Sequence, residues 1–433
     1  MADFFSYRKG VLHCEEIAVG EIAREHGTPI YIYSARTILE HYRKIRQAFA
    51  DQVNCLICYS VKANSNLSIL RILQQEGAGF DVVSKGEIVR ALKIGADPAK
   101  IVFAGVGKRE DEIEYALDKN ILLFNVESEE EILALEKIAA RKKTEARVAL
   151  RVNPDVDPKT HTYIATGKKE SKFGVDLGRA CEILDRMREL RHVRLIGIHA
   201  HIGSQITQVT PYVESLSRLT QFLPECAKRG HKIEWVDIGG GFGIFYKDKA
   251  ARSAKEIADA LLPVLIKTGC KILLEPGRFI VGNAGILVTR VLYRKESGDK
   301  KFYICDGGMT ELIRPTLYGA YHRIWPVRTD ASVEGEAPDE ETWAGPKQKS
   351  DVVGPICESG DFFAKDRPMP PVDQGALLAV FSAGAYGSVM SSNYNTHPRP
   401  AEILVSGMKT VVVAERETEE DIFRREKIVD VFP

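Results

Sequence analysis

The sequence lacks any apolar run long enough to cross a bilayer, and it has no excess of either charge sign. Its 433 residues carry 60 Lys and Arg against 60 Asp and Glu. A chain without net charge has no electrostatic footprint for nucleic acid or for an anionic membrane. These absences argue against nucleic-acid and membrane partners. A small molecule or another subunit is the expected partner.

The N-terminus and the cysteines lack the features of secreted proteins. The opening residues, MADFFSYRKG, contain neither the apolar core nor the cleavage site of a signal peptide. The eight cysteines are scattered, apart from Cys55 and Cys58. These two lie in a predicted strand, where positions three apart face opposite sides. We therefore expect a cytoplasmic protein without a disulfide framework, and core packing rather than redox chemistry at this pair.

What the sequence does have is a regular alternation of strand and helix patterns. Short β-rich apolar runs are separated by amphipathic helical patterns such as 66–77, which ends at a glycine. The runs are 57–63, 79–84, 101–105, 122–127, 147–153, 194–203, 234–241 and 271–277. Eight such α/β units in about 250 residues predict a (β/α)8 TIM barrel.

The pattern changes after Gly277. Apolar runs continue at 284–296, 301–308, 375–387 and 401–407, without long helices between them. This change predicts a C-terminal β-rich domain of the sandwich or barrel type. We expect the barrel to occupy residues 29–279 and the second domain to combine 1–28 with 280–433.

The first run ends in YSVKAN, which places Lys62 at the end of a predicted strand. An ammonium group is rarely buried unless it is paired or used, because burial disfavours the charged form and lowers its pKa. Taken alone, the position favours a lysine that merely reaches solvent. Catalytic groups of barrels collect at the C-terminal ends of the strands. The other strand ends carry Asp81, His201, Gly239 to Gly241 and Glu275. Together these residues favour a functional lysine.

Motifs at these strand ends suit an aldehyde cofactor that carries a phosphate and a pyridine ring. In DIGGGFG, residues 237–243, glycines allow backbone N–H groups to approach a phosphate, although such a turn alone is a weak signal. In EPGR, the Glu275 carboxylate can hold a pyridine nitrogen protonated. Alone, Glu275 would instead favour a salt bridge with Arg278.

The motif HAHIGSQ places His199 and His201 two residues apart, which invites a metal interpretation. No acidic or cysteine ligand follows at a spacing that would complete a metal site, so none is expected. Stacking of His201 on an aromatic cofactor, with Ser204 on its phosphate, fits better. A core role stays open for His199.

Nine motifs form one set: YSVKAN, GFDVVSKGE, SKFGV, HIGSQ, DIGGGFG, EPGR, CDGGMTELIRPTLYGAYH, GPICESGDFFAKDR and GAYGSVMSSNYN. This set resembles the diaminopimelate decarboxylase family, pyridoxal-phosphate enzymes whose class includes ornithine decarboxylase and alanine racemase. The resemblance runs from Pro29 to Pro400. IRPTLY and CESGD are its most specific parts, because the barrel motifs are common to the whole class.

The resemblance implies a role for each matching residue. Lys62 would bind the cofactor covalently, His201 would stack on its ring, and Cys357 would donate a proton to the product. The catalytic set would be Lys62, Cys357, His201 and Glu275. The cofactor-binding set would be Lys62, Asp81, His201, Ser204, Gly240, Glu275, Gly277, Arg278 and Tyr386. The substrate-binding set would be Arg278, Arg314, Tyr318, Glu358 and Tyr386.

The implied reaction is decarboxylation of meso-2,6-diaminopimelate to L-lysine and carbon dioxide, the last step of lysine biosynthesis, with pyridoxal 5'-phosphate as cofactor. Two arginines and a glutamate suit the zwitterionic far end of this substrate, because guanidinium groups fork onto carboxylates. Two alternatives stay open. One is a decarboxylase of lysine, ornithine or arginine. The other is a non-catalytic relative that binds the cofactor, which should have lost Lys62 or Cys357.

Three further expectations concern assembly and loops. In the family, Cys357 and Glu358 reach the partner's barrel, which implies a homodimer with shared active sites. The loop Asp157–Gly174 is long and polar, as expected equally of a lid and of an ordinary surface loop. Pro315 predicts an extended backbone at Arg314.

Overall fold

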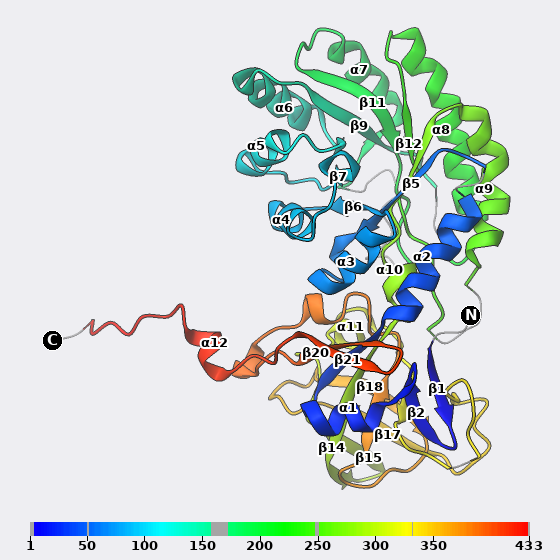
Figure 1. Cartoon of the computed structure of the whole chain (residues 1–433), viewed down its shortest axis with the longest axis vertical. Coiled ribbons are helices and arrows are strands. Elements are labelled where there is room, and N and C mark those ends of the chain that lie inside the picture. Colours follow the sequence, from blue (N-terminus) through cyan, green and yellow to red (C-terminus); the bar gives the residue numbers. More distant parts are fainter. Residues whose placement is uncertain (1–3, 50–51, 157–171, 247–250, 331, 432–433) are drawn as a thin grey trace. The chain divides into compact units, whose positions relative to one another are not determined.

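The structure is a computed structural model that describes residues 4–49, 52–156, 172–246, 251–330 and 332–431. The chain divides into two compact units, whose elements are labelled in Figure 1. The first unit is Ile38–Ile280, and the second combines Met1–Thr37 with Val281–Pro433. Among the helices of these described ranges, none is long and apolar enough to span a membrane.

Eight parallel strands close into a barrel in the first unit. They pair in the order β9-β11-β12-β13-β5-β6-β7-β8, and β8 pairs back with β9. The strands are β5 (Cys55–Ser60), β6 (Gly79–Val82), β7 (Ile101–Phe103), β8 (Leu123–Val126), β9 (Ala146–Asn153), β11 (Val193–His199), β12 (Trp235–Asp237) and β13 (Lys271–Leu274). Each predicted run overlaps one of these strands, so the (β/α)8 prediction is confirmed.

Helices surround the barrel strands in Figure 1. They are α2 (Ala35–Phe49), α3 (Leu67–Gln75), α4 (Lys85–Lys93), α5 (Glu110–Asp118), α6 (Glu129–Lys142), α7 (Leu177–Met187), α8 (Thr210–Lys228) and α9 (Ala254–Thr268). Serine hydroxyls define several starts. Ser84 and Ser128 each accept a hydrogen bond from the backbone N–H three residues later, which satisfies a donor that the helix leaves open.

The second unit is built on a mixed sheet. Its strands follow the order β18-β17-β15-β14-β4-β20-β21, and β19 joins β14 to β16. The bounds are β4 (Ile30–Ser34), β14 (Gly285–Ser297), β15 (Lys300–Cys305), β16 (Ile324–Pro326), β17 (Gln348–Val353), β18 (Phe362–Met369), β19 (Leu377–Val380), β20 (Ala401–Ser406) and β21 (Lys409–Ala414). The prediction of a β-rich second domain is confirmed.

The N-terminal segment supplies part of the second unit's core. The small sheet β1 (Phe5–Arg8), β2 (Val11–Cys14) and β3 (Ile17–Ala18) precedes α1 (Val19–His26). Phe5 and Leu12 are buried in one apolar cluster with Ile286 and Trp325. The chain therefore begins in the second unit before it enters the barrel.

The expected start of the barrel at residue 29 would include strand β4, which lies instead in the second unit. Strand β4 pairs with β14 and β20, in the sheet of the second unit. Its five residues are all buried, so an apolar run alone did not reveal which sheet it joins. The expected lid falls mostly outside the described residues, because only 172–174 of Asp157–Gly174 are described.

Candidate active site

Lys62 lies in a short 3-10 turn, η1 (Val61–Ala63), directly after β5. Its Nζ is 2.7 Å from Oδ2 of Asp81. Asp81 lies on the neighbouring strand β6, and its side chain is fully buried. The Ser60 hydroxyl donates to the same oxygen at 2.7 Å. The Lys62 side chain is 39% exposed, so its ammonium group is not fully removed from water. A buried carboxylate, rather than desolvation, holds this amine at the strand end.

Glycines after β12 form a turn in which added Cβ atoms would overlap neighbouring groups. Gly239 and Gly241 have φ of +69° and +89°, the left-handed region that glycine tolerates. A Cβ on Gly240 would overlap the carbonyl oxygen of Glu275. The Gly240 N–H donates to His201 Nδ1 at 3.3 Å, which leaves Nε2 to carry the proton of the neutral ring. Burial and the nearby cation of Arg151 lower the pKa of His201.

Arg278 brings two hydroxyl groups to the same end of the barrel. Its guanidinium donates to Tyr246 OH at 2.6 Å and to Ser204 Oγ at 3.1 Å. Gly277, just before it, sits so tightly that an added Cβ would lie 2.9 Å from Ala63 Cβ. Hydroxyl, guanidinium and backbone N–H groups are the donors that anions require.

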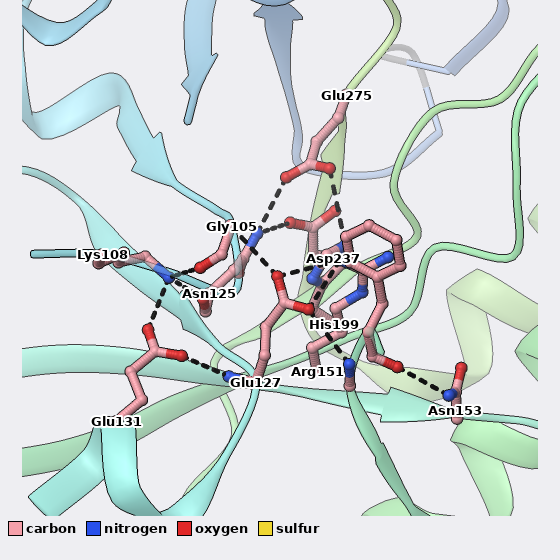
Figure 2. Close-up of polar contacts among 12 residues, drawn as sticks. Gly105, Lys108, Asn125, Glu127, Glu131, Arg151, Asn153, His199, Asp237 and Glu275 are labelled. Atoms are coloured by element: carbon pink, nitrogen blue, oxygen red, sulfur yellow. Dashed lines mark hydrogen bonds and ion pairs between the residues drawn. The ribbon is translucent and has the colours of Figure 1, made fainter. Parts of the chain in front are cut away.

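Two buried carboxyl groups face each other beside the glycine turn. Asp237 ends β12, and Glu275 follows the neighbouring strand β13. The amide of Asn125 donates to Asp237 Oδ2 at 3.1 Å and to Glu275 Oε1 at 3.0 Å, as Figure 2 shows. Burial, together with the charge of Asp237, raises the pKa of Glu275 well above its ordinary range. Burial also raises the pKa of Asp237 to about 6.

His199 lies beside these carboxyls, with its Nε2 3.6 Å from Glu275 Oε2. The ligand atoms of His199, Asp237 and Glu275 all lie within 4.8 Å of one another. The expectation that no acidic ligand would accompany the histidines is therefore wrong, because the fold brings two acidic groups to His199. The Asn125 N–H donors point at both carboxyls, which suits a shared hydrogen bond better than a cation.

A buried ion pair fixes the backbone next to the site. Arg151 Nη1 donates to both oxygens of Glu127, at 3.0 Å each. Glu127 also accepts from the backbone N–H of Gly174 at 3.1 Å, and the Arg151 guanidinium packs 4.8 Å from the Phe173 ring centroid. Asn153 donates to the Phe173 carbonyl at 2.7 Å. Phe173 and Gly174 of the SKFGV motif are thus anchored to β9 and to the end of β8.

Lys108, in the GVGK segment, is used within the structure. Its buried Nζ donates to Glu131 Oε1 at 2.6 Å and to the carbonyls of Gly105 and Asn125 at 2.8 and 2.7 Å (Figure 2). All three ammonium donors are therefore occupied. The segment forms a turn, and its lysine is engaged by the protein itself.

The remaining predicted site residues belong to the second unit. Arg314 is buried, and its Nη1 lies 2.9 Å from His322 Nε2. His322 Nδ1 lies 2.9 Å from the carbonyl oxygen of Phe381, which can only accept. Nδ1 therefore carries the proton, and Nε2 accepts from the arginine. This buried, neutral histidine fixes the direction of the guanidinium.

The backbone at Arg314 is helical, so the expectation of an extended arginine is wrong. Arg314 begins α11 (Arg314–Tyr318), and Pro315 occupies its first turn. Proline is tolerated there because the missing N–H would have no partner within the helix. Tyr318, the last residue of α11, lies one turn further along it.

Cys357, Glu358 and Tyr386 lie in loops of the second unit. Cys357 and Glu358 fall between β17 and β18, and the Cys357 thiol belongs to an exposed residue. Its backbone N–H donates to Asn395 Oδ1 at 3.2 Å. Tyr386 has φ of +56°, a conformation that is rare for a bulky residue and that occurs often at functional sites.

Comparison with known proteins identifies the family. A model of the pyridoxal-dependent decarboxylases, pyridoxal binding domain, matches residues 35–282. The diaminopimelate decarboxylase of Aquifex aeolicus is 46% identical over 96% of this chain and 95% of its own. This chain belongs to the diaminopimelate decarboxylase family. The Pseudomonas aeruginosa member is also 46% identical, over 99% of both chains. The Helicobacter pylori enzyme, solved with L-lysine, is 39% identical over 94% of this chain and 98% of its own, with a TM-score of 0.87.

The barrel residues fit the family's pyridoxal phosphate, which makes this chain a pyridoxal-dependent amino-acid decarboxylase. The glycine turn leaves room that any Cβ would fill. The Arg278 guanidinium donates to Ser204 Oγ at 3.1 Å, so a cation and a hydroxyl, two groups that bind phosphate, lie next to each other. Lys62 offers an amine for an aldehyde, and Glu275 offers a carboxyl for a ring nitrogen.

Some residues of the site were missed in the sequence. Ser60, Asn125 and Arg151 were not singled out, and Asp237 was treated only as part of a glycine motif. Each lies near the C-terminal end of a barrel strand, two positions beyond a residue that faces the barrel interior. The period of two along each strand was the signal that could have found them. His322 carried no such signal, because its role depends on a carbonyl 59 residues away.

Proposed function

We propose that this chain decarboxylates meso-2,6-diaminopimelate to L-lysine and carbon dioxide, with pyridoxal 5'-phosphate held in the barrel. The arrangement of three consecutive strand ends carries the proposal. Lys62 follows β5, Glu275 follows β13, and the glycine turn follows β12. The names of the full-length relatives and the L-lysine in the Helicobacter pylori structure support this substrate and product.

In the barrel, each residue has a distinct task. When bound, the cofactor supplies an electron sink for the carbanion that remains after loss of carbon dioxide. Lys62 provides the amine that attaches to its aldehyde, and Asp81 orients that amine. Ser204, the turn at Gly240 and the backbone at Gly277 and Arg278 bind the phosphate. His201 packs on the ring, and Glu275 holds a proton at its nitrogen.

Residues of the second unit recognise the far end of the substrate. Arg314 and Tyr318, together with Arg278, bind the distal carboxylate, and Glu358 binds the distal amine. Tyr386 lines both ligands. His322 supports this role for Arg314, because it orients the guanidinium through one nitrogen without cancelling its charge. A positive fork aimed at a carboxylate favours a diamino diacid over lysine, ornithine or arginine.

Cys357 donates the proton that replaces the lost carboxylate, from an exposed thiol. We propose that Cys357 and Glu358 act in the partner's barrel, so that the second unit completes the active site of a homodimer. Chains carrying Lys62→Ala and chains carrying Cys357→Ala, each nearly inactive, should regain part of the activity when mixed and exchanged. Proven heterodimers without activity would place both residues in one subunit's site.

The proposed cytoplasmic location rests on the sequence alone.

A substrate panel tests the proposed reaction. The purified, cofactor-loaded chain receives meso-diaminopimelate, lysine, ornithine or arginine, and carbon dioxide release is recorded. Release from diaminopimelate alone supports the proposal. Release from another basic amino acid would favour the alternative decarboxylase, and no release from any would favour a non-catalytic relative.

The Arg314→Leu variant sharpens this panel. A charged hydrogen bond to a carboxylate contributes roughly 1.5–3 kcal/mol, so kcat/KM for diaminopimelate should fall by roughly tenfold to several hundredfold. Discrimination against lysine should shrink, because the unpaired arginine that penalises lysine is gone. Arg399→Leu removes an exposed arginine of the same unit and should change neither value. Undiminished diaminopimelate turnover in Arg314→Leu would show that the clamp is misassigned.

A further inference from the structure

Glu275 does not stand alone in the barrel, because a second carboxyl, that of Asp237, faces it across one hydrogen bond. We propose that Asp237, with Asn125, is a positioning residue that keeps a proton on Glu275 in the cofactor-free chain and makes that proton available to the ring nitrogen. This inference rests on the proposed function, because it concerns the residue that would face the ring nitrogen.

The hydrogen bonds decide which of the two carboxyls is ionised. Asp237 accepts from two N–H groups, the backbone of Gly239 at 2.9 Å and the amide of Asn125 at 3.1 Å. Among the described residues, the Glu275 carboxyl accepts one N–H hydrogen bond, from Asn125 at 3.0 Å, and its other oxygen faces His199. A carboxylate that accepts several N–H bonds keeps its charge. Asp237 therefore holds the negative charge, and Glu275 donates the proton shared between them.

The surrounding charges favour one proton on the pair. Asp81, on β6, is a further anion, and it raises the pKa of both carboxyls. Lys62 opposes this effect but is engaged by Asp81 at 2.7 Å. His199 does not supply a positive charge, because burial and the cation of Arg151 lower its pKa. Two neighbouring buried carboxyls with a third anion beside them therefore favour sharing one proton.

The proposed transfer balances within the site. The Glu275 O–H bond breaks and an N–H bond forms at the ring nitrogen, so Glu275 becomes a carboxylate and no proton is drawn from water. Asn125 donates to Oε1 (Figure 2), so Oε2 is the oxygen that would carry the proton to be transferred. Without the charge of Asp237, Glu275 would ionise at a lower pH. It would then have no proton to give to the ring nitrogen.

Infrared spectroscopy of the cofactor-free, full-length chain tests the first half of the proposal. The band of a protonated carboxylic acid is followed from acid to alkaline pH, and the difference from Glu275→Gln isolates Glu275. Other buried acids, such as Glu311, cancel in this difference. In Asp237→Asn the midpoint of the Glu275 band should move at least about one pH unit lower, because a neighbouring like charge is removed. Glu112→Gln, a buried acid at the start of α5, should leave the midpoint unchanged.

Two results would overturn this half. One is a band that survives in Glu275→Gln, which would put the proton elsewhere. The other is an equal midpoint in wild type and a folded Asp237→Asn. If Asp237→Asn fails to fold, Asn125→Ala serves instead, because it removes the donor that Asp237 and Glu275 share. In Asn125→Ala the Glu275 midpoint should move higher, because both carboxyls lose an N–H donor that stabilises their charged form, and an unchanged midpoint would count as the second result.

Calorimetry of pyridoxal phosphate binding, in buffers of different ionisation enthalpy, tests the second half. Near neutral pH the Asp237→Asn chain should take up about one proton more per site than wild type, because its Glu275 has already ionised. Equal uptake by the two chains would overturn the transfer. Failure of the substrate panel is a separate outcome, since both measurements here are made without substrate and do not depend on turnover.

Discussion

The inner face of the barrel carries two kinds of side chain along the same strands. One apolar cluster is formed by residues of the barrel strands. Two residues further along, on the same face, the side chains are polar and buried. The changes on five strands are Cys58 to Ser60, Leu123 to Asn125, Ala149 to Arg151, Trp235 to Asp237 and Leu273 to Glu275. On each of these strands, the side chain that packs in the apolar cluster and the polar side chain of the site are therefore two residues apart.

The two levels contribute opposite terms to stability. The apolar level removes hydrocarbon from water, which stabilises the fold by roughly 25 cal/mol for each Å² buried. The polar level removes charges from water, and it is compensated only where partners are supplied, as Asn125 does for two carboxyls. The buried polar side chains therefore lower the stability of the fold. The barrel tolerates them because the apolar side chains of the same strands stabilise it.

Removal of the amine at the polar end should have the largest effect on activity. Lys62→Ala should lower kcat by roughly 10³-fold or more, because the cofactor loses its covalent attachment. Visible absorbance of the linked cofactor should disappear. Lys85→Ala is a matched control, since Lys85 is 40% exposed and also pairs with a carboxylate. A Lys62→Ala chain with an unchanged visible spectrum would contradict the assignment.

Removal of a side chain from the apolar level should affect stability instead. Leu273→Ala should lower the free energy of unfolding by about 2–5 kcal/mol, because a fully buried leucine leaves a cavity. The value of kcat per folded molecule should change by less than about threefold. Denaturant unfolding and active-site titration measure the two quantities, with exposed Ile266→Ala on α9 as the control. A large loss of kcat with unchanged stability would erase the distinction between the levels.

Removal of the Asp237 charge should stabilise the cofactor-free chain, and the gain should grow as pH rises. Asp237 and Glu275 bind protons more tightly when folded, because burial raises both pKa values. Unfolding then releases protons above the ordinary carboxyl pKa near 4, so the free energy of unfolding of the cofactor-free chain falls with rising pH up to the raised pKa values. Asp237→Asn should flatten this fall and gain on the order of 1–3 kcal/mol over wild type by pH 7. Parallel curves for the two chains would refute this.

Much of this comparison could be read from the sequence, and some could not. The β runs and their C-terminal ends located Lys62 and Glu275, because a closed parallel barrel collects its strand ends on one side. Asn125 was missed because an asparagine inside LLFNVE carries no motif. Its importance arises from Asp237 and Glu275, which are 112 and 150 residues away. Spacing along the chain gives no measure of such closeness.

The second unit shows the same limit. Strand β4 resembles a barrel strand in composition, and only its pairing with β14 and β20 assigns it to the other sheet. The helix at Arg314 was missed because the rule for residues before proline describes a preference that the first turn of a helix can override.

The smallest effect should come from the two cysteines of β5, which test whether the inner face is distinct even within one strand. Cys58 faces the apolar level and is fully buried, whereas Cys55 is partly exposed. The Cys58 sulfur fills the space above Gly79, where an added Cβ would lie 2.8 Å from it. Cys58→Ala should therefore cost about 1 kcal/mol of unfolding free energy, and Cys55→Ala less than about 0.5 kcal/mol. Denaturant unfolding under reducing conditions separates the two. Equal losses would mean that the two faces of β5 are packed alike, contrary to the alternation on which the comparison depends.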